Sequence, residues 1–324
     1  MTRVIQISKV EETRLWRALS DSSDGDAKAI APNVVLLCEE AADRMKAMYI
    51  YAPQYTLHDD RHLLRVTELM ACVLGSELKR LNTVELALLV LSAFFHDQGM
   101  VPLETEIASI DQNESFRLFK DNWLIEHPNY GETASQMVSA HVNEGRRKAL
   151  ASRLAELDSA MLTDYLRSTH GRRSDEFIRS SYYSDRRLEV QGSNLSSILG
   201  KLCLSHTLQT EDLTPANGFR YDEQVGRFTV NLPFLAAVLR LADILDFDRD
   251  RTPEVLLKNI HFTSDVSIRE WEKHRSVEGW AISDTRIRFT INCSHPAYES
   301  AARMYMDWID TELTACHALC QNQP

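Results

Sequence analysis

The sequence predicts a mainly α-helical protein with a small α+β part at its C-terminal end. Apolar residues recur at three- and four-residue spacing through most of the first 250 residues. Gly and Pro are few, at 11 and 9 of 324 residues. Beyond Pro253, short stretches rich in β-branched and aromatic residues replace the helical pattern. We therefore predict a helical domain over 1–253, with its core over about 55–253, and an α+β subdomain over 254–324.

The helical pattern can be divided into segments along the chain. Helices are predicted over about 33–51, 60–80, 83–97, 115–124, 130–143, 147–168, 173–180, 195–208 and 231–246. The segments 100–130 and 181–194 are expected to be insertions or loops.

The C-terminal part is expected to form a small antiparallel sheet and a closing helix. The candidate strands are 255–262, 277–282 and 285–292, and the polar turn Ser283-Asp284 separates the last two. The closing helix is predicted over 296–318. Its apolar residues at helical spacing, including Trp308, are typical of a core or dimer contact.

Composition restricts the class of protein. With 44% hydrophobic and 26% charged residues, no apolar run near 18 residues and no apolar core of a signal peptide, the chain is predicted to be cytoplasmic and without a membrane contact. The six cysteines are scattered without a CxxC pair, which predicts reduced thiols. A net charge of −11 disfavours non-specific nucleic-acid binding and leaves nucleic acid as a substrate only.

One apolar segment ends in a histidine and an aspartate side by side. Residues 86–95 are almost wholly apolar and lead into His96 and Asp97, after which Gly99 is expected to permit a sharp exit of the chain. Polar groups at a buried position need compensation, and a metal ion is the expected partner. A second pair, His58-Asp59, lies in a polar stretch where a capped helix start explains it.

Further donor side chains stand where apolar stretches begin or end. His62 opens an amphipathic segment, and His170 and His206 end apolar ones. Asp243 lies inside an otherwise apolar helix and needs a partner, whereas Asp246 either shares its face or is an exposed helix-end residue. Nitrogen and oxygen donors in this mixture suit Mn, Fe, Co, Ni or Zn.

The order His62, His96-Asp97, His170, His206, Asp243 resembles the HD superfamily of metal-dependent phosphohydrolases, over about residues 55–253. The stretches LRSTHGRRS, LCLSHTLQTEDL and LAAVLRLADILDFDRDRTP are most similar to the branch found beside heat-shock chaperone-like ATPase domains in bacteria, often in defence contexts.

The resemblance implies a metal centre. One divalent ion would be held by His62, His96, Asp97 and Asp243, and Asp97 would bridge to a second ion at His170 and His206. One or two ions are expected, with Mg as a further option and no organic cofactor. His127, in His127-Pro-Asn-Tyr-Gly131, resembles a turn of the HD-GYP phosphodiesterases and stays open as an alternative to His170.

The resemblance also implies a hydrolase. It would cleave a phosphoester or phosphoanhydride of a nucleotide, as a deoxynucleotide triphosphohydrolase or as a phosphodiesterase, with a metal-activated hydroxide. The candidate catalytic residues are Asp97, His58 and Arg172. The candidates for phosphate contact are Arg65, Arg173 and Arg249, with Arg251 as a further basic residue.

The alternative is a non-catalytic nucleotide-sensing module that signals to a partner ATPase or effector. A nucleotide ligand, a homo-oligomer and a chaperone-like ATPase partner complete the expectations.

Overall fold

The computed structural model describes residues 7–139, 141–258, 260, 262, 265–283 and 285–321. Over these residues the chain is mainly α-helical, as predicted. The α-helices are α1 (Arg14–Ser20), α2 (Gly25–Met45), α3 (Met48–Tyr51), α4 (Asp60–Leu74), α5 (Thr83–Phe95), α6 (Glu104–Ala108), α7 (Glu114–Glu126), α8 (Pro128–Val138), α9 (Glu144–Tyr182), α10 (Ser196–Ser205), α11 (Leu232–Leu245), α12 (Glu254–Leu257), α13 (Asp265–Arg275) and α14 (Pro296–Gln321).

Short 3-10 helices and antiparallel hairpins connect these helices. The 3-10 helices are η1 (Val10–Glu12), η2 (Gly75–Arg80), η3 (Gln98–Met100), η4 (Ile110–Gln112), η5 (Arg186–Leu188), η6 (Thr210–Asp212), η7 (Pro215–Asn217) and η8 (Arg249–Arg251). The strands pair in chain order and are β1 (Glu189–Val190) with β2 (Ser193–Asn194), β3 (Glu223–Val225) with β4 (Phe228–Val230), and β5 (Val277–Ser283) with β6 (Arg286–Ile291).

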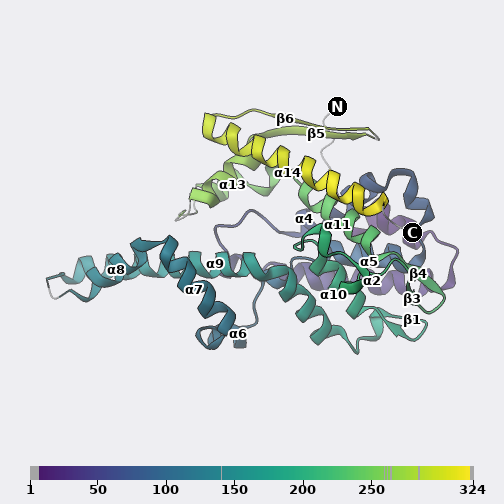
Figure 1. Ribbon diagram of the computed structural model, residues 1–324, viewed down its shortest axis with the longest axis horizontal. Helices are drawn as coiled ribbons and strands as arrows, with labels where there is room; N and C mark the ends of the chain where they lie inside the picture. The colour runs from purple at the N-terminus through teal and green to yellow at the C-terminus, as the bar shows by residue number, and fades with distance from the viewer. Residues whose placement is uncertain are drawn as a thin grey trace.

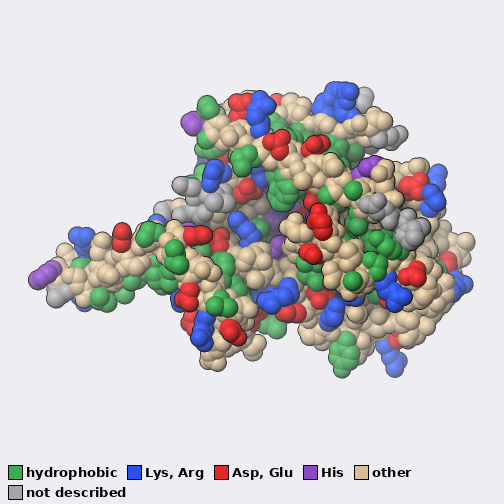
Figure 2. Space-filling view, in the orientation of Figure 1, with side chains coloured by type: hydrophobic (Ala, Val, Ile, Leu, Met, Phe, Trp, Pro, Cys, Tyr) green, Lys and Arg blue, Asp and Glu red, His purple; other side chains and the backbone are tan. Residues whose placement is uncertain are grey.

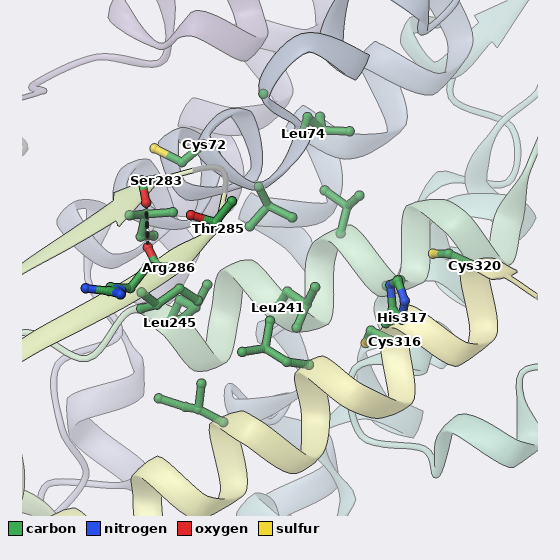
Figure 3. A pocket seen from close by; sticks show the side chains of 18 of the residues that line it. Cys72, Leu74, Leu241, Leu245, Ser283, Thr285, Arg286, Cys316, His317 and Cys320 are labelled. Atoms are coloured by element: carbon green, nitrogen blue, oxygen red, sulfur yellow. Dashed lines mark hydrogen bonds between the residues drawn. The ribbon is translucent and has the colours of Figure 1, made fainter.

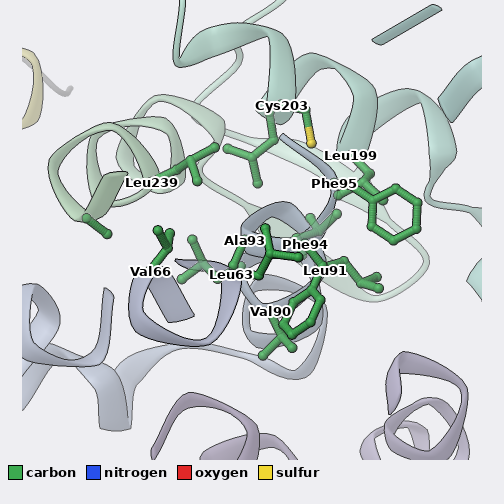
Figure 4. Packing of buried hydrophobic residues seen from close by; sticks show 14 of the residues in the cluster. Leu63, Val66, Val90, Leu91, Ala93, Phe94, Phe95, Leu199, Cys203 and Leu239 are labelled. Carbon is green, nitrogen blue, oxygen red and sulfur yellow. The ribbon is translucent and has the colours of Figure 1, made fainter. Parts of the chain in front are cut away.

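Helix α5 lies at the centre of the hydrophobic core. Every one of its residues is buried, and α2, α4, α10 and α11 surround it. Figure 4 shows Leu63 of α4, Leu199 of α10 and Leu239 of α11 converging on its side chains. The segment 83–108 is apolar and long enough to cross a membrane by composition, but 94% of its apolar window is buried inside the protein, as in a core helix.

Helix α9 is a single helix of 39 residues, so its prediction as two helices, over 147–168 and 173–180, was wrong. Its first part projects from the body together with α6, α7 and α8, and its second part packs on α10 and η3 (Figure 1). The predicted break lies near Gly171. A Cβ there would come within 2.0 Å of Thr207 Oγ1, in the loop after α10. This glycine therefore permits close packing of α9 against that loop and does not end the helix.

Helix α2 begins at Gly25, earlier than predicted, and contains Pro32. The side chain of Asp24 caps its first turn by accepting a hydrogen bond from Asp26 N. An interior proline costs a helix about 3 kcal/mol. The buried face that includes Ile30 and Val34 keeps the helix continuous across it.

The predicted C-terminal hairpin and closing helix are confirmed as β5–β6 and α14. The prediction of a strand over 255–262 was wrong where the structure describes it, because Glu254–Leu257 form α12. An ion pair of 2.7 Å between Glu254 and Lys258, four residues apart, favours the helical turn. Residues 259 and 261 of that predicted strand lie outside the described residues.

Helices α12 to α14 and strands β5 and β6, here called the C-terminal unit, pack on the helical body. The Tyr305 hydroxyl of α14 donates to Ile244 O at 2.8 Å, and the fully buried Trp271 of α13 donates through Nε1 to Gln54 O at 3.0 Å. A cavity of about 890 Å³ remains between α14, α11, the hairpin and the end of α4, lined by Leu241, Arg286 and other residues (Figure 3).

Candidate metal centre

All six predicted metal ligands come together at one place. His62 lies in the first turn of α4, His96 and Asp97 directly follow α5, His170 lies in α9, His206 directly follows α10 and Asp243 lies in α11. Five helices therefore converge on this cluster. Histidine side chains are visible in the hollow below the C-terminal unit in Figure 2.

The first ligand group consists of His62, His96, Asp97 and Asp243. His96 Nε2 lies 3.1 Å from Asp97 Oδ2 and 3.7 Å from Asp243 Oδ1. His62 Nε2 lies 3.6 Å and 3.7 Å from the same two oxygens, and 3.4 Å from His96 Nε2. Two imidazole nitrogens and two carboxylate oxygens thus surround one point.

The second ligand group uses the other oxygen of Asp97. His170 Nε2 lies 3.4 Å and His206 Nε2 3.7 Å from Asp97 Oδ1, and the two nitrogens are 2.8 Å apart. Because Oδ2 faces the first group and Oδ1 the second, Asp97 has the position of a carboxylate that bridges two ions.

The histidines in the cluster present Nε2 because Nδ1 is already bonded. The Nδ1 atoms of His96 and His170 donate to the carbonyls three residues earlier, at 3.0 Å from Ala93 O and 2.6 Å from Arg167 O. His206 Nδ1 donates in the same way to Cys203 O. This bond fixes both ring orientation and tautomer, as in histidine ligands of metal sites.

Asp246 performs the same task for His62. Its Oδ2 lies 2.6 Å from His62 Nδ1, and both of its oxygens accept hydrogen bonds from Arg65, at 2.6 Å and 3.2 Å. Asp246 is therefore a buried residue behind the cluster and not an exposed helix-end residue. The guanidinium of Arg65 is committed to this pair and does not face the pocket.

The acids of the cluster are ionised. Burial acts against charge on Asp97, but the charge of His96 and the hydrogen bond of His206 outweigh it and hold the pKa of Asp97 well below its usual value. The pKa of Asp243 is lowered too, since the hydrogen bond and the charge of His96 outweigh burial. Carboxylates bind metals in this ionised form.

The histidines differ in their protonation. Burial and the neighbouring His206 lower the pKa of His170 to about 4, so its ring is neutral. For His96, burial is outweighed by Asp97 and Asp243, which raise its pKa well above the usual value. A divalent ion between the same carboxylates would replace the charge of that proton.

His58 lies in the cluster, although its neighbour Asp59 has the predicted role of a helix cap and accepts a hydrogen bond from His62 N. The Nδ1 of His58 donates to Thr56 O at 2.7 Å. Its Nε2 accepts a hydrogen bond from Arg251 Nη2 at 2.6 Å and lies 3.6 Å from Asp97 Oδ2. Burial and the charge of Arg251 lower the pKa of His58 well below its usual value, so the ring is neutral.

The cluster opens into a pocket of about 520 Å³. Its walls include Tyr55, Arg167 and Arg251 from the helical body, and Lys273 and Trp308 from the C-terminal unit. The pocket is thus formed by residues from both parts of the chain, before and after the predicted boundary at residue 253.

Several predicted residues lie away from the pocket. The side chain of Arg172 is 54% exposed and faces Glu176 on α9, and Arg249 is exposed in η8. Arg173 binds Gly99 O and Glu106, which ties η3 and α6 to α9. His127 stacks on Trp123 in the projecting part, with ring centroids 3.8 Å apart, and does not join the cluster. These positions do not support roles in catalysis, phosphate contact or metal binding.

Gly99 is required for a reason other than the one predicted. Its φ is not in the left-handed region. A Cβ at Gly99 would lie 2.0 Å from His170 O and 2.7 Å from Ser174 N, so only glycine lets the chain after Asp97 approach the backbone of α9. The hydroxyl of Ser174 completes this contact by accepting from Gly99 N and donating to His96 O.

The pocket also holds residues that the sequence did not assign to a site. Lys273, His274 and Tyr305 belong to the C-terminal unit, and Lys273 is only 3% exposed. The burial of Lys273 is what indicates a function, and this burial cannot be predicted from the sequence around the residue. The sequence Trp271-Glu-Lys-His274 by itself reads as an ordinary polar helix.

The donor set fits divalent transition metals. The Nε2 atoms of His170 and His206 are 2.8 Å apart while both Nδ1 atoms donate elsewhere, so a proton or a metal ion has to lie between the two Nε2 atoms, and a metal can use both lone pairs. Imidazole and carboxylate are suitable ligands for Mn, Fe, Co, Ni and Zn. The residues present can therefore hold a metal at each of the two groups.

The comparisons with known proteins agree with this geometry. The family model described as HD-CE matches residues 52–315. This range contains all six donors and most of the C-terminal unit. The comparison with curated proteins and the comparison with solved structures gave no match.

Proposed function

The chain belongs to the HD-CE family, and we propose that it is a metal-dependent phosphohydrolase that acts on a nucleotide. The observation that carries the proposal is the common orientation of four histidines, whose Nε2 atoms all face the two oxygens of Asp97. Structural histidines of a core have no reason to share this arrangement, whereas ligands of a binuclear centre require it.

The proposed roles follow from position. His62, His96 and Asp243 would hold one ion, His170 and His206 the other, and Asp97 would bridge them. Bound divalent ions would lower the pKa of a coordinated water and neutralise charge on phosphate oxygens. Asp246 and Arg65 keep His62 oriented from behind.

His58 and Arg251 form one unit at the pocket wall. Because Arg251 occupies the Nε2 lone pair of His58, we assign His58 to positioning Arg251 and not to proton transfer. Arg251 is also held by Leu57 O at 3.3 Å, so its guanidinium is fixed within the pocket. A fixed guanidinium is suited to contact a substrate phosphate.

A nucleotide fits the pocket in size and character. A volume of about 520 Å³ lies within the usual range of small-molecule sites. The indole of Trp308 is 58% exposed at the pocket wall and offers a surface on which a base can stack. Cytoplasmic location, oligomeric state and a chaperone-like ATPase partner stay predictions.

Metal analysis with a hydrolysis panel tests the proposal. Purified wild-type protein is expected to carry about two divalent ions per chain by mass spectrometry and to hydrolyse one of a set of deoxynucleotides and phosphodiesters. Asp97→Ala is expected to lose both metal and hydrolysis because it removes the bridging ligand. Asp111→Ala, which changes an exposed aspartate of η4, is the matched control and is expected to retain both.

Histidine variants test the two-group arrangement in the same experiment. His206→Ala is expected to lose one ion and His127→Ala none, since His127 lies outside the cluster. Wild-type protein without metal would contradict the site. Stoichiometric metal without hydrolysis of any compound in the panel would contradict the hydrolase and favour the regulatory module.

A further inference from the structure

The pocket contains four basic side chains, and three of them are already compensated. Arg240 forms two hydrogen bonds with Glu312, at 2.5 Å and 3.1 Å. Lys273 lies 2.6 Å from Glu270. Arg251 lies 3.8 Å from Asp246 Oδ2 and donates to His58.

Arg167 differs from these three residues. Among the residues that the structure describes, no carboxylate lies within 4.0 Å of its guanidinium, and its buried Nε has no hydrogen-bond partner. A buried donor left without an acceptor costs about 1–3 kcal/mol. The position therefore indicates an acceptor that a ligand would supply.

The guanidinium of Arg167 is held next to the metal centre. It lies over the ring of Tyr55, 4.6 Å from the centroid, and Tyr55 in turn contacts the ring of His58. The carbonyl of Arg167 accepts the Nδ1 hydrogen bond of His170, so the residue lies one helical turn before a ligand of the second group. Side chains at this spacing lie on the same face of a helix, with their Cβ atoms about 5–6 Å apart.

The charges around the pocket define the kind of ligand. Four cations and four carboxylates line it, so its own charges balance in a chain of net charge −11. Divalent ions at the cluster would make the pocket positive, which favours an anion. A guanidinium matches the oxygens of phosphate better than any other side chain does, through parallel N–H···O bonds.

We propose that Arg167 is a phosphate-binding residue, which contacts the substrate phosphate at the His170 side of the metal centre. This inference rests on the proposed function. It replaces the basic residues expected from the sequence, since Arg65 and Arg173 are bound to carboxylates and Arg172 and Arg249 face solvent.

Calorimetric titration of metal-loaded protein with inorganic phosphate tests this role without any turnover. Arg167→Met is expected to bind phosphate at least about tenfold more weakly than wild type, because a charge-assisted contact is lost. Arg172→Met is the matched control on the same helix and is expected to bind phosphate as wild type does. Metal content is measured for each variant, and it is expected to be unchanged.

Arg167→Lys keeps a charge over Tyr55 and covers the case in which methionine destabilises the protein. It is expected to bind phosphate with an affinity below that of wild type and above that of Arg167→Met, or simply below wild type if Arg167→Met does not fold. Unchanged phosphate affinity in a metal-loaded Arg167 variant would overturn the inference, and so would wild-type protein that binds metal but no phosphate. Phosphate binding that depends on Arg167 in a protein without hydrolysis would keep the inference and reject only the hydrolase.

Discussion

Asp246 has two functions: it orients His62, a predicted metal ligand, and it compensates the buried charge of Arg65. It contacts His62 Nδ1 and pairs with Arg65, and all three side chains are buried. Burial acts to raise the pKa of Asp246, but Arg65 and His62 outweigh it and lower the pKa well below the usual value. The carboxylate is therefore charged and cannot be removed without consequence.

Asp246→Ala is expected to destabilise the protein by about 3–5 kcal/mol, because Arg65 would be left as an unpaired buried charge. Denaturant unfolding of the metal-free protein measures this loss. Glu176→Ala removes the exposed partner of Arg172 and is expected to cost less than about 1 kcal/mol. An equal effect of the two substitutions would show that Arg65 does not depend on its partner.

At the scale of the elements, the metal centre depends on how closely η3 and α9 approach. Asp97 precedes η3 and His170 lies on α9. The distance between these two elements therefore sets how far His170 Nε2 lies from Asp97 Oδ1 in the second ligand group. Gly99 permits this approach, and the hydroxyl of Ser174 links the two backbones.

Gly99→Ala is expected to lower metal content at the second group, because the added Cβ would collide with His170 O and push η3 away from α9. Gly131→Ala in α8 is the matched control, since nothing lies within 4 Å of its added Cβ. The control is expected to raise stability by about 0.5–1 kcal/mol through helix propensity. Metal analysis and thermal unfolding of both variants measure the effects, and full metal content in Gly99→Ala would contradict this explanation.

At the scale of the whole molecule, the C-terminal unit and the helical body share contacts and a pocket. Tyr305 and Trp271 donate to backbone carbonyls of the body, and Arg240 of α11 pairs with Glu312 of α14. The apolar face of α14, with Ala302 and Ile309, is buried as the sequence predicted, but Trp308, whose ring contacts that of Tyr305, is exposed at the pocket.

We expect the full chain to unfold in one cooperative transition, because separation at residue 253 would expose the contact between α11 and α14. Differential scanning calorimetry measures this through the ratio of calorimetric to van't Hoff enthalpy, expected to be near unity. Two separated transitions would show that 254–324 is an independent domain, as its change of sequence pattern suggests.

Local patterns in the sequence were sufficient for some features and not for others. The long apolar run before His96 predicted a buried helix that ends just before His96 and Asp97, and α5 confirms this helix. The basic side chains could not be assigned, because an arginine in a helix has the same local pattern whether it faces a pocket, as Arg167 does, or solvent, as Arg172 does. Whether an arginine is free to face the pocket depends on carboxylate partners that are distant in sequence, such as Asp246 for Arg65.

The helical fold, the order of the donor residues along it and the hairpin and helix at the C-terminal end could all be predicted from the sequence. These features depend on periodicity and residue type within short windows, where local physical chemistry is sufficient. The position of Asp246 behind His62 and the contribution of the C-terminal unit to the pocket became visible only in the packed structure, which also brings Asp97 between the two donor groups. The reason is that these contacts join residues up to 217 positions apart, and only packing of the helices brings them within hydrogen-bond distance.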